Sequence, residues 1–353
     1  MPKLNPNIDF SKLESLHSKA LDKYVQMLRL LYTSAIDNVV KVSIIAKLRG
    51  DNPFLFSDFP KIGAEVDKIL AQLSGNITDL IDSGTLNQWV ASNEKNDLLV
   101  DDVLRQFTLN KSDFSNYYGR NLPAYEQFQK QKINGRSLSE RVWDLTKGQF
   151  KEELEMSIDI GLLDGRSAAQ MARDIKQYLN EPKKLFRRVR DARGELHLSK
   201  HAKAYTPGQG QYRSSFKNAF RLTRSQINMS YRSADLERWQ QIDFIIGFEV
   251  KLSGAHLVFD ICDVLKGIYP KGFNFVGWHP ACMCFMVPVM TSKEDFIKQI
   301  KGEKVDFKYV NNVPEGFDQW ITDNSERISG WKNKPYFIRD NFKDGQISNG
   351  LHF

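Results

Sequence analysis

The chain has 353 residues and a formal net charge of +7; 41% of its residues are hydrophobic and 26% are charged. These values are typical of a folded globular protein, and they exclude a largely disordered chain, a collagen-like fibre and a disulfide-stapled miniprotein. At roughly 150 residues per domain, the length corresponds to about two domains. No run approaches the ~18 consecutive apolar residues of a membrane span, and the N-terminus lacks the pattern of a secretory signal. With only three cysteines, we expect a soluble protein of the reducing cytoplasm, with no membrane partner.

The first part of the chain, residues 1–135, predicts a helical region. Residues 11–48 form the first expected helix, with Leu16, Ala20, Tyr24, Leu28 and Leu31 at helical spacing. Residues 51–60 include two prolines and predict a loop. Further helices are expected over residues 62–81 and 96–107. The polar, glycine-containing stretch 109–136 marks a domain boundary.

Residues 136–290 form the second expected segment, in which helix starts are well marked. Ser137 with Glu140, and Ser167 with Gln170, have the spacing of capping boxes. We expect the apolar side chains behind the first box to share one buried helix face; they are Trp143, Phe150, Leu154 and Ile158.

Residues 183–205 predict a basic hairpin, and residues 214–241 predict a long helix. Strands are expected over residues 244–252 and 285–289, with Pro288 placing the second strand at a sheet edge. Residues 291–353 form a C-terminal extension containing short helices. The fold class is therefore α+β and predominantly helical, with a small β-sheet next to a Cys/His-rich loop.

Positive charge is concentrated between Lys183 and Arg238. This segment holds fourteen Lys or Arg residues against four Asp or Glu residues, so its formal charge is +10, while the rest of the chain carries −3. Such a block predicts either contact with phosphates or a solvated face that pairs with acidic residues. No sequence-reading motif accompanies it, so any contact with DNA would be to the backbone. The candidate contacts are Arg187, Arg188, Arg190, Lys217, Arg221, Arg224 and Arg232.

All three cysteines lie between residues 262 and 284, in the connection between the two expected strands. Thiolate and imidazole are the ligands that zinc prefers, and three cysteines with one histidine make a closed tetrahedral site. The candidate ligands are Cys262, His279, Cys282 and Cys284, with His256 and Asp260 as alternatives. A structural zinc is the expected cofactor. The other interpretation is a set of buried free thiols with a histidine bonded to the backbone.

Two elements around these cysteines resemble a known family. Asp260-Ile-Cys262-Asp263 and Trp278-His279-Pro280-Ala281-Cys282-Met283-Cys284, preceded by the Arg-bearing segment 221–239, are similar to the phage Mu F-like minor head proteins, also called phage head morphogenesis proteins. The resemblance covers about residues 137–290. It departs from the family where many members carry a second cysteine, at Leu265, and where many carry an arginine, at Met283.

The resemblance implies a minor head (capsid) protein of a tailed phage or prophage that acts in head morphogenesis near the portal. Its partners would be portal and capsid proteins, and its basic segment could contact packaged DNA. Its location would be the virion head, and the host cytoplasm during assembly.

An enzyme is the alternative hypothesis. The Cys/His/Asp cluster could serve a metal-dependent nuclease, another hydrolase or a toxin, with Asp260 or Asp263 as a base. No Gly-x-Ser-x-Gly nucleophile motif is present, and no spacing singles out catalytic residues in the extension 291–353, which we interpret as a docking appendage. We therefore expect a binding protein without a small-molecule substrate.

Overall fold

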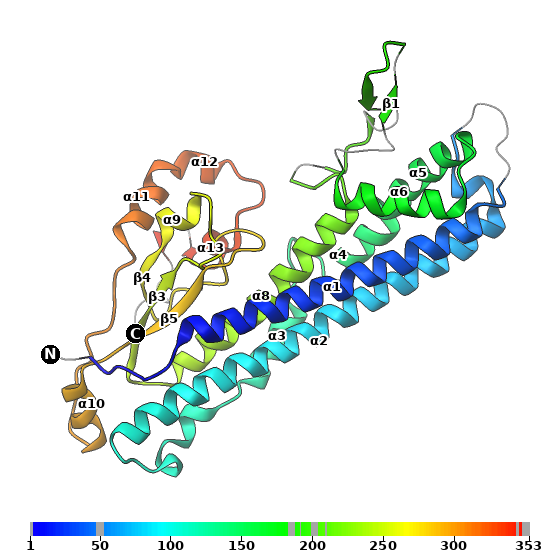
Figure 1. Ribbon diagram of the computed structural model, residues 1–353. Helices are drawn as coiled ribbons and strands as arrows, with labels where there is room; N and C mark the ends of the chain where they lie inside the picture. Colours follow the sequence, from blue (N-terminus) through cyan, green and yellow to red (C-terminus); the bar gives the residue numbers. More distant parts are fainter. Residues whose placement is uncertain are drawn as a thin grey trace. The chain divides into compact units, whose positions relative to one another are not determined.

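The computed structural model describes residues 3–46, 53–182, 188–190, 192–198, 204–208, 210–343 and 346–347 (Figure 1). Contacts divide the chain into two compact units. The helical unit contains residues 22–83 and 131–224, and the sheet unit contains residues 1–21, 84–130 and 225–353. These units do not follow the expected segments 1–135, 136–290 and 291–353. Three of the four boundaries between them fall inside helices: α1 (Phe10–Ser43), α2 (Pro60–Gln106) and α8 (Ser215–Gln240).

The helical unit is built from α-helices around one apolar core that includes Leu28, Val66 and Leu154. Both predicted capping boxes are present, because the Ser137 and Ser167 side chains accept hydrogen bonds from the backbone of Glu140 and Gln170. The basic hairpin is confirmed where it is described, as an antiparallel strand pair. Besides its parts of α1, α2 and α8, the unit contains a 3-10 helix (Phe56–Asp58), α4 (Leu138–Trp143), a π-helix (Asp144–Phe150), α5 (Lys151–Leu163), α6 (Ala168–Asn180), β1 (Arg188–Arg190) and β2 (Leu196–Leu198).

Helix α1 confirms the helix expected over residues 11–48, and its buried face partly matches the expected stripe. Of that stripe, Leu28 is buried, Ala20, Tyr24 and Leu31 are half-buried, and only Leu16 is exposed, at 54%. Leu21 and Val25, each one position further along the helix, are buried. The buried face is therefore rotated by about one residue from the stripe that begins at Leu16.

Helix α2 replaces the two helices expected over residues 62–81 and 96–107. The polar residues between them continue the helix instead of breaking it. Thr85, Ser92 and Asn93 are buried there, and the Asn93 side chain donates to the Trp89 carbonyl 2.9 Å away. Tertiary packing of a polar helix face thus overrides its weak intrinsic helix propensity.

A π-helix corrects the expected face behind Ser137. Phe150, Leu154 and Ile158 are fully buried, but Trp143 is 46% exposed and Val142 occupies the core instead. The π-helical turns from Asp144 to Phe150 contain more residues per turn than an α-helix. The buried stripe therefore shifts by one residue across this segment.

The sheet unit contains a three-stranded antiparallel sheet of order β4-β3-β5. Strands β3 (Ile245–Lys251) and β5 (Phe285–Met290) confirm the two expected strands, and β4 (Gly267–Pro270) was not expected. In the register, Glu249 of β3 lies opposite Ile268 of β4 and Val287 of β5. β5 pairs only with β3 among the named strands, so Pro288 does lie on an edge strand. The α+β, predominantly helical class is confirmed.

The sheet unit also contains a series of short helices, some around the sheet and some beside the long helices (Figure 1). They are a 3-10 helix (Lys111–Tyr118), α3 (Leu122–Lys130), α9 (Ile261–Leu265), α10 (Lys293–Ile300), α11 (Glu315–Asp323), α12 (Ser325–Ser329) and α13 (Tyr336–Arg339), followed by the strand pair β6 (Phe342–Lys343) and β7 (Gln346–Ile347). Among the described helices, none combines the length and the apolar character needed to cross a membrane.

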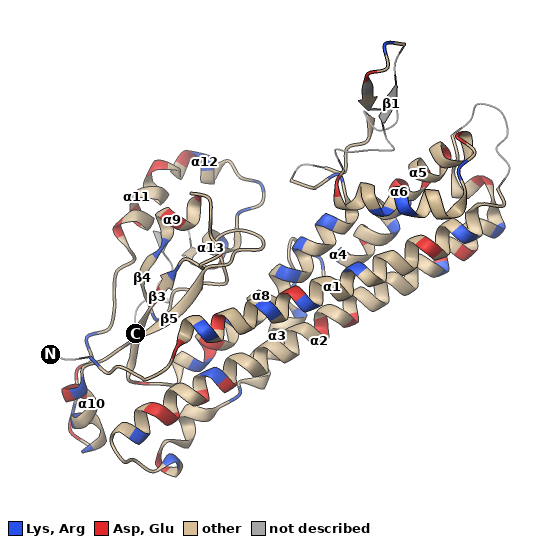
Figure 2. Ribbon diagram, in the orientation of Figure 1, with Lys and Arg blue, Asp and Glu red and all other residues tan. Residues whose placement is uncertain are grey.

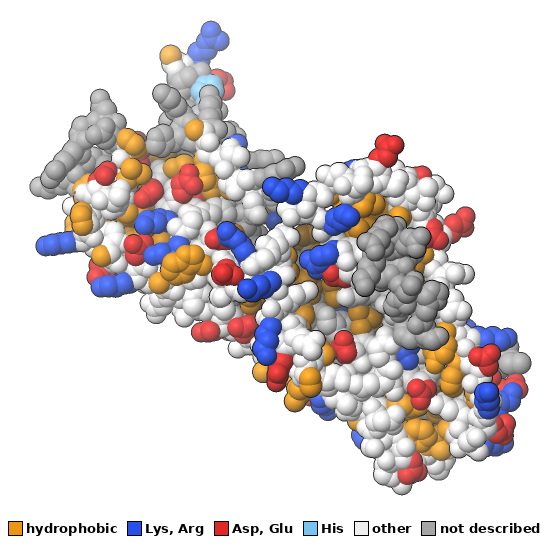
Figure 3. All heavy atoms as spheres, turned by 180° about the vertical axis from the view of Figure 1, so that it is seen from behind, with side chains coloured by type: hydrophobic (Ala, Val, Ile, Leu, Met, Phe, Trp, Pro, Cys, Tyr) orange, Lys and Arg blue, Asp and Glu red, His pale blue; other side chains and the backbone are white. Residues whose placement is uncertain are grey.

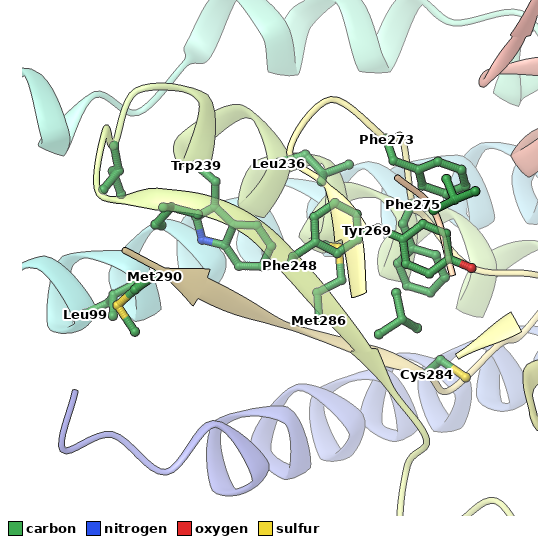
Figure 4. Packing of buried hydrophobic residues seen from close by; sticks show 14 of the residues in the cluster. Leu99, Leu236, Trp239, Phe248, Tyr269, Phe273, Phe275, Cys284, Met286 and Met290 are labelled. Carbon is green, nitrogen blue, oxygen red and sulfur yellow. The ribbon is translucent and has the colours of Figure 1, made fainter. Parts of the chain in front are cut away.

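The core of the sheet unit is rich in aromatic side chains. The rings of Tyr269 and Phe273 lie 4.5 Å apart, and Tyr269 also stacks on Phe248 of β3. Figure 4 shows these rings beside Trp239 of α8, with Cys284 at the start of β5. The core therefore holds the connection between β3 and β5, which carries all three cysteines, against α8.

Candidate metal centre

Cys262 is fixed by the start of helix α9. The carboxylate of Asp260 accepts the backbone N–H of Cys262 at 2.7 Å, and the Asp263 carboxylate accepts the backbone N–H of Asp260 at 2.9 Å. This reciprocal arrangement is a capping box, which determines where the helix begins. Cys262 therefore sits in the first turn of α9, with its thiol buried.

His279 and Cys282 lie in a tight turn before β5. The backbone N–H of Cys282 donates to the carbonyl of His279 at 3.1 Å. Ala281 adopts a left-handed conformation with φ of 60°, and its N–H donates to Ser225 Oγ of α8 at 2.9 Å. The turn is thus held against α8, and it directs the Cys282 thiol inward.

The structure brings Cys262, His279 and Cys282 together, with their ligand atoms all within 4.8 Å of one another. The Sγ atoms of Cys262 and Cys282 are 3.7 Å apart, and Cys262 Sγ lies 3.2 Å from His279 Nε2. Two thiolates about 2.3 Å from a tetrahedral zinc would be about 3.8 Å apart. The sulfur spacing therefore fits a shared zinc ion.

The orientation of His279 also suits a metal ligand. Its Nδ1 lies 3.0 Å from the carbonyl oxygen of Pro280, which can accept a hydrogen bond only when Nδ1 carries the proton. That tautomer leaves the Nε2 lone pair facing Cys262. Metal-bound histidines are commonly oriented by a hydrogen bond of this kind from the other ring nitrogen.

Cys284 is not part of this group of three, although its thiol interacts with those of both Cys262 and Cys282. Asp260 also lies close to the imidazole, with its Oδ2 3.5 Å from His279 Nε2. His256, Asp260 and Cys262 form a second group that shares Cys262. In that group His256 is already engaged, since its Nε2 lies 2.7 Å from Asp263 Oδ2, and this contact raises the pKa of His256.

The thiols influence one another's ionisation. Hydrogen bonding with Cys282 and Cys284, together with burial, raises the pKa of Cys262. Hydrogen bonds from Cys262 and Cys284 lower the pKa of Cys282. Cys282 is thus the thiol of the three that ionises most readily, and a bound cation would favour thiolates at the other positions as well.

The predicted phosphate contacts fall in different places. Arg187 lies outside the described residues, and Arg188 and Arg190 lie in β1. Three others lie on α8, in the part of it that belongs to the helical unit: Lys217, Arg221 and Arg224. Figure 2 shows basic residues along this helix. On the face drawn in Figure 3, basic and acidic side chains are interspersed.

Two of these arginines have partners within the helical unit. Arg224 Nη1 lies 2.6 Å from Asp22 Oδ1, and Arg221 donates to the carbonyl of Gly210 at 3.0 Å. Arg232 requires a correction. Its side chain is 2% exposed and its Nη2 lies 2.6 Å from Glu14 Oε2, so it is enclosed in the sheet unit and is not displayed to a DNA backbone.

The sequence interpretation did not identify Glu14, His17, Lys95 and Asp235, which are buried around Arg232. Helical spacing could have indicated two of them, because Glu14 and His17 lie seven and four residues before Leu21 and so share the buried face of α1. Lys95 and Asp235 carry no such signal, because no sequence pattern links two residues on different helices.

Comparisons with known proteins add no relative: no family model matches this sequence, and neither the curated proteins nor the solved structures yield a match. The resemblance to the Mu F-like proteins therefore rests on the motif residues themselves, and what is established of the centre is a Cys/His cluster with metal-binding spacing.

Proposed function

We propose that this protein is a minor head protein of a tailed phage or prophage and acts in head morphogenesis near the portal. The observation that carries this proposal is the convergence of its two motif elements. Cys262 of the first element meets His279 and Cys282 of the second within 4.8 Å. This convergence is expected if the two motif elements that resemble the Mu F-like proteins form one common site.

That purpose, we propose, is to hold a structural zinc ion. Cys262, His279 and Cys282 supply three ligands, and Cys284 supplies the fourth, with Asp260 as the alternative. When bound, zinc would cross-link α9 to the turn before β5. The chain between them is regular only in the short strand β4, so a cross-link there would restrict the remaining loop.

The basic region would supply a partner surface. Lys217, Arg221 and the hairpin residues Arg188 and Arg190 belong to the most basic part of the chain. A portal, capsid or DNA surface rich in negative charge would be attracted to it. No sequence-reading motif accompanies this region, so contacts with a DNA backbone would position the protein without reading a base sequence.

The proposal is tested by counting copies of this chain in phage heads. Full and empty heads are purified from induced or infected source cells, and the chain is quantified by mass spectrometry against the portal and major capsid proteins. We expect a few copies per head. Heads assembled with Cys282→Ser should contain fewer copies, and those with Gln72→Ala, an exposed position of α2 outside the centre and the basic region, should not. Absence from both kinds of head would overturn the proposal.

A further inference from the structure

Three consecutive apolar side chains project from the loop between β3 and α9 in the sheet unit. Leu257 is 90% exposed, Val258 is 75% exposed and Phe259 is 79% exposed. Single exposed apolar residues are common on protein surfaces, whereas contiguous ones mark a surface that contacts a partner. We call residues 257–259 the apolar tip.

One carboxylate holds the apolar tip at both of its ends. Oδ2 of Asp263 lies 2.7 Å from Nε2 of His256, which directly precedes the tip. The same oxygen accepts the backbone N–H of Asp260, which directly follows the tip, at 2.9 Å. A loop that is fixed in this way loses less conformational freedom on binding than a flexible one. The three apolar side chains are therefore presented on a preorganised backbone.

The charges beside the tip favour a protein partner over a lipid surface. Residues 251–266 contain two lysines, Lys251 and Lys266, and two aspartates, Asp260 and Asp263, so their formal net charge is zero with histidine neutral. Segments that bind anionic membranes combine apolar side chains with an excess of Lys or Arg. This loop has no such excess.

An apolar groove of about 650 Å³ lies elsewhere on the sheet unit. It is bounded by the segment that leads into α1 and by the face of the sheet that carries Ile268 and Val287. Ile8 and Phe10 line it on one side, and Ile268, Val287 and Val289 line it on the other. Grooves of this volume are typical of sites that hold a drug-sized ligand, so three side chains can enter it.

The groove and the tip carry opposite charges at their edges. Lys3 and Lys293 line the groove, and both are exposed. Glu249 also lines it, but its Oε2 lies 3.2 Å from Lys251 Nζ, so this carboxylate has its own cation. The side chain of Asp260, beside the tip, is 41% exposed. Complementary charges of this kind set the orientation in which two apolar surfaces meet.

We propose that the apolar tip of one copy of this chain enters the groove of a second copy. Leu257, Val258 and Phe259 contact the apolar lining, and Asp260 faces Lys3 and Lys293. Because tip and groove are different surfaces, the contact is head-to-tail, and a dimer still offers one tip and one groove. Association therefore continues beyond the dimer, as a ring or as a chain. The contact does not rest on the proposed head function.

Sedimentation velocity of the reduced, zinc-supplemented full chain, at concentrations from about 5 to about 500 µM, tests the proposal. A contact made by one loop buries little area, so we expect weak association that grows with concentration and passes beyond the dimer. Phe259→Asp should weaken this association by at least about tenfold. Leu30→Asp is the control, because Leu30 is a 68% exposed residue of α1 outside both surfaces, and it should associate as the parent does.

Two variants test the groove. Ile268→Glu places a charge among the apolar lining, at a position that is 43% exposed, and should weaken association by at least about tenfold. Lys293→Glu reverses a charge at the edge of the groove and should weaken it as well. Lys293 is exposed at the first position of α10, where a glutamate suits the helix dipole, so this variant should fold.

Mixing a tip variant with a groove variant distinguishes a head-to-tail contact from a symmetric one. Phe259→Asp keeps its groove and Ile268→Glu keeps its tip. At concentrations where each alone is monomeric, an equimolar mixture should therefore form heterodimers and nothing larger. A parent that stays monomeric at every concentration, a Lys293→Glu variant that associates as the parent does, or a mixture that stays monomeric would each overturn the proposal.

Discussion

The Nζ atom of Lys95 on α2 lies 2.6 Å from Oδ2 of Asp235 on α8, and neither side chain is appreciably exposed. The Asp235 carboxylate also accepts hydrogen bonds from Ser92 Oγ at 2.7 Å and from the Asn96 amide at 2.8 Å. A buried ion pair adds little net stability compared with an apolar pair. Replacing only one of its two side chains, however, leaves the other charge buried and uncompensated. This pair therefore acts as a constraint on how the two helices pack in the sheet unit.

Lys95→Met should destabilise the protein by about 3–5 kcal/mol, because the buried Asp235 loses the cation it is paired with, while Glu14 keeps Arg232. The double variant with Asp235→Leu should recover much of this loss. Urea unfolding followed by tryptophan fluorescence measures both. As a control, Lys298→Met breaks an exposed pair with Glu294 and should cost less than about 1 kcal/mol. Equal effects of the two single lysine variants would contradict the buried network.

His17 should make stability fall as the pH is lowered from about 6.5 to about 4. Burial, with Arg232, lowers the pKa of His17 to about 4, so in this range the unfolded chain binds a proton that the folded protein does not. Stability therefore rises with pH across this window, by a total of about 3 kcal/mol. Between pH 4 and pH 6.5, the unfolding free energy of the parent should rise by about 3 kcal/mol more than that of His17→Gln. Parallel curves would show that His17 is not buried in its neutral form.

Two glycines of α2 should respond to alanine in opposite directions. A Cβ at Gly75 would meet no atom within 4 Å, so Gly75→Ala should stabilise the helix by about 0.5–1 kcal/mol. A Cβ at Gly63 would lie 2.8 Å from the backbone oxygen of Phe56, which cannot move without shifting the chain, so Gly63→Ala should be destabilising. Thermal melting of both variants provides the comparison. A stabilising Gly63→Ala would refute the close approach of the 3-10 helix to α2.

DNA binding, if the basic region provides it, should depend steeply on salt and not on sequence. Each phosphate contact releases a counterion, so Arg221→Ala should reduce the slope of log affinity against log salt by about one. Fluorescence anisotropy with two duplexes of unrelated sequence gives these slopes. Arg105→Ala, a basic position outside the segment, should leave the slope unchanged. A flat salt response of the parent would reject the phosphate role.

Much of the fold followed from local signals in the sequence. The capping boxes at Ser137 and Ser167 locate helix starts, because the side chains involved are only three residues apart. Pro288 indicates an edge strand, because proline lacks the N–H that a central strand needs. Features that depend on tertiary packing were not predicted. Periodicity could not reveal the π-helix that exposes Trp143, nor the packing that makes α2 continuous.

The candidate site was predictable to a similar extent. The chemistry of cysteine and histidine identified the residues, and three of the four meet in space. The basic residues of α8 were less informative. Their spacing places Arg221 and Arg232 on the same side of the helix, but it does not show which of the two is buried by another helix. Arg232 is enclosed by α1 through Glu14, a partner that is remote in sequence.

Native mass spectrometry of the reduced, untagged protein tests the central claim, that Cys262, His279 and Cys282 hold one zinc ion. We predict a mass increase of one zinc, with loss of the displaced thiol protons, that disappears in Cys262→Ser and Cys282→Ser and persists in His197→Ala. Loss of zinc in Cys284→Ser but not in Asp260→Asn would identify the fourth ligand as the thiol. A folded parent that remains metal-free with zinc present, or a Cys282→Ser variant that retains zinc, would contradict the account.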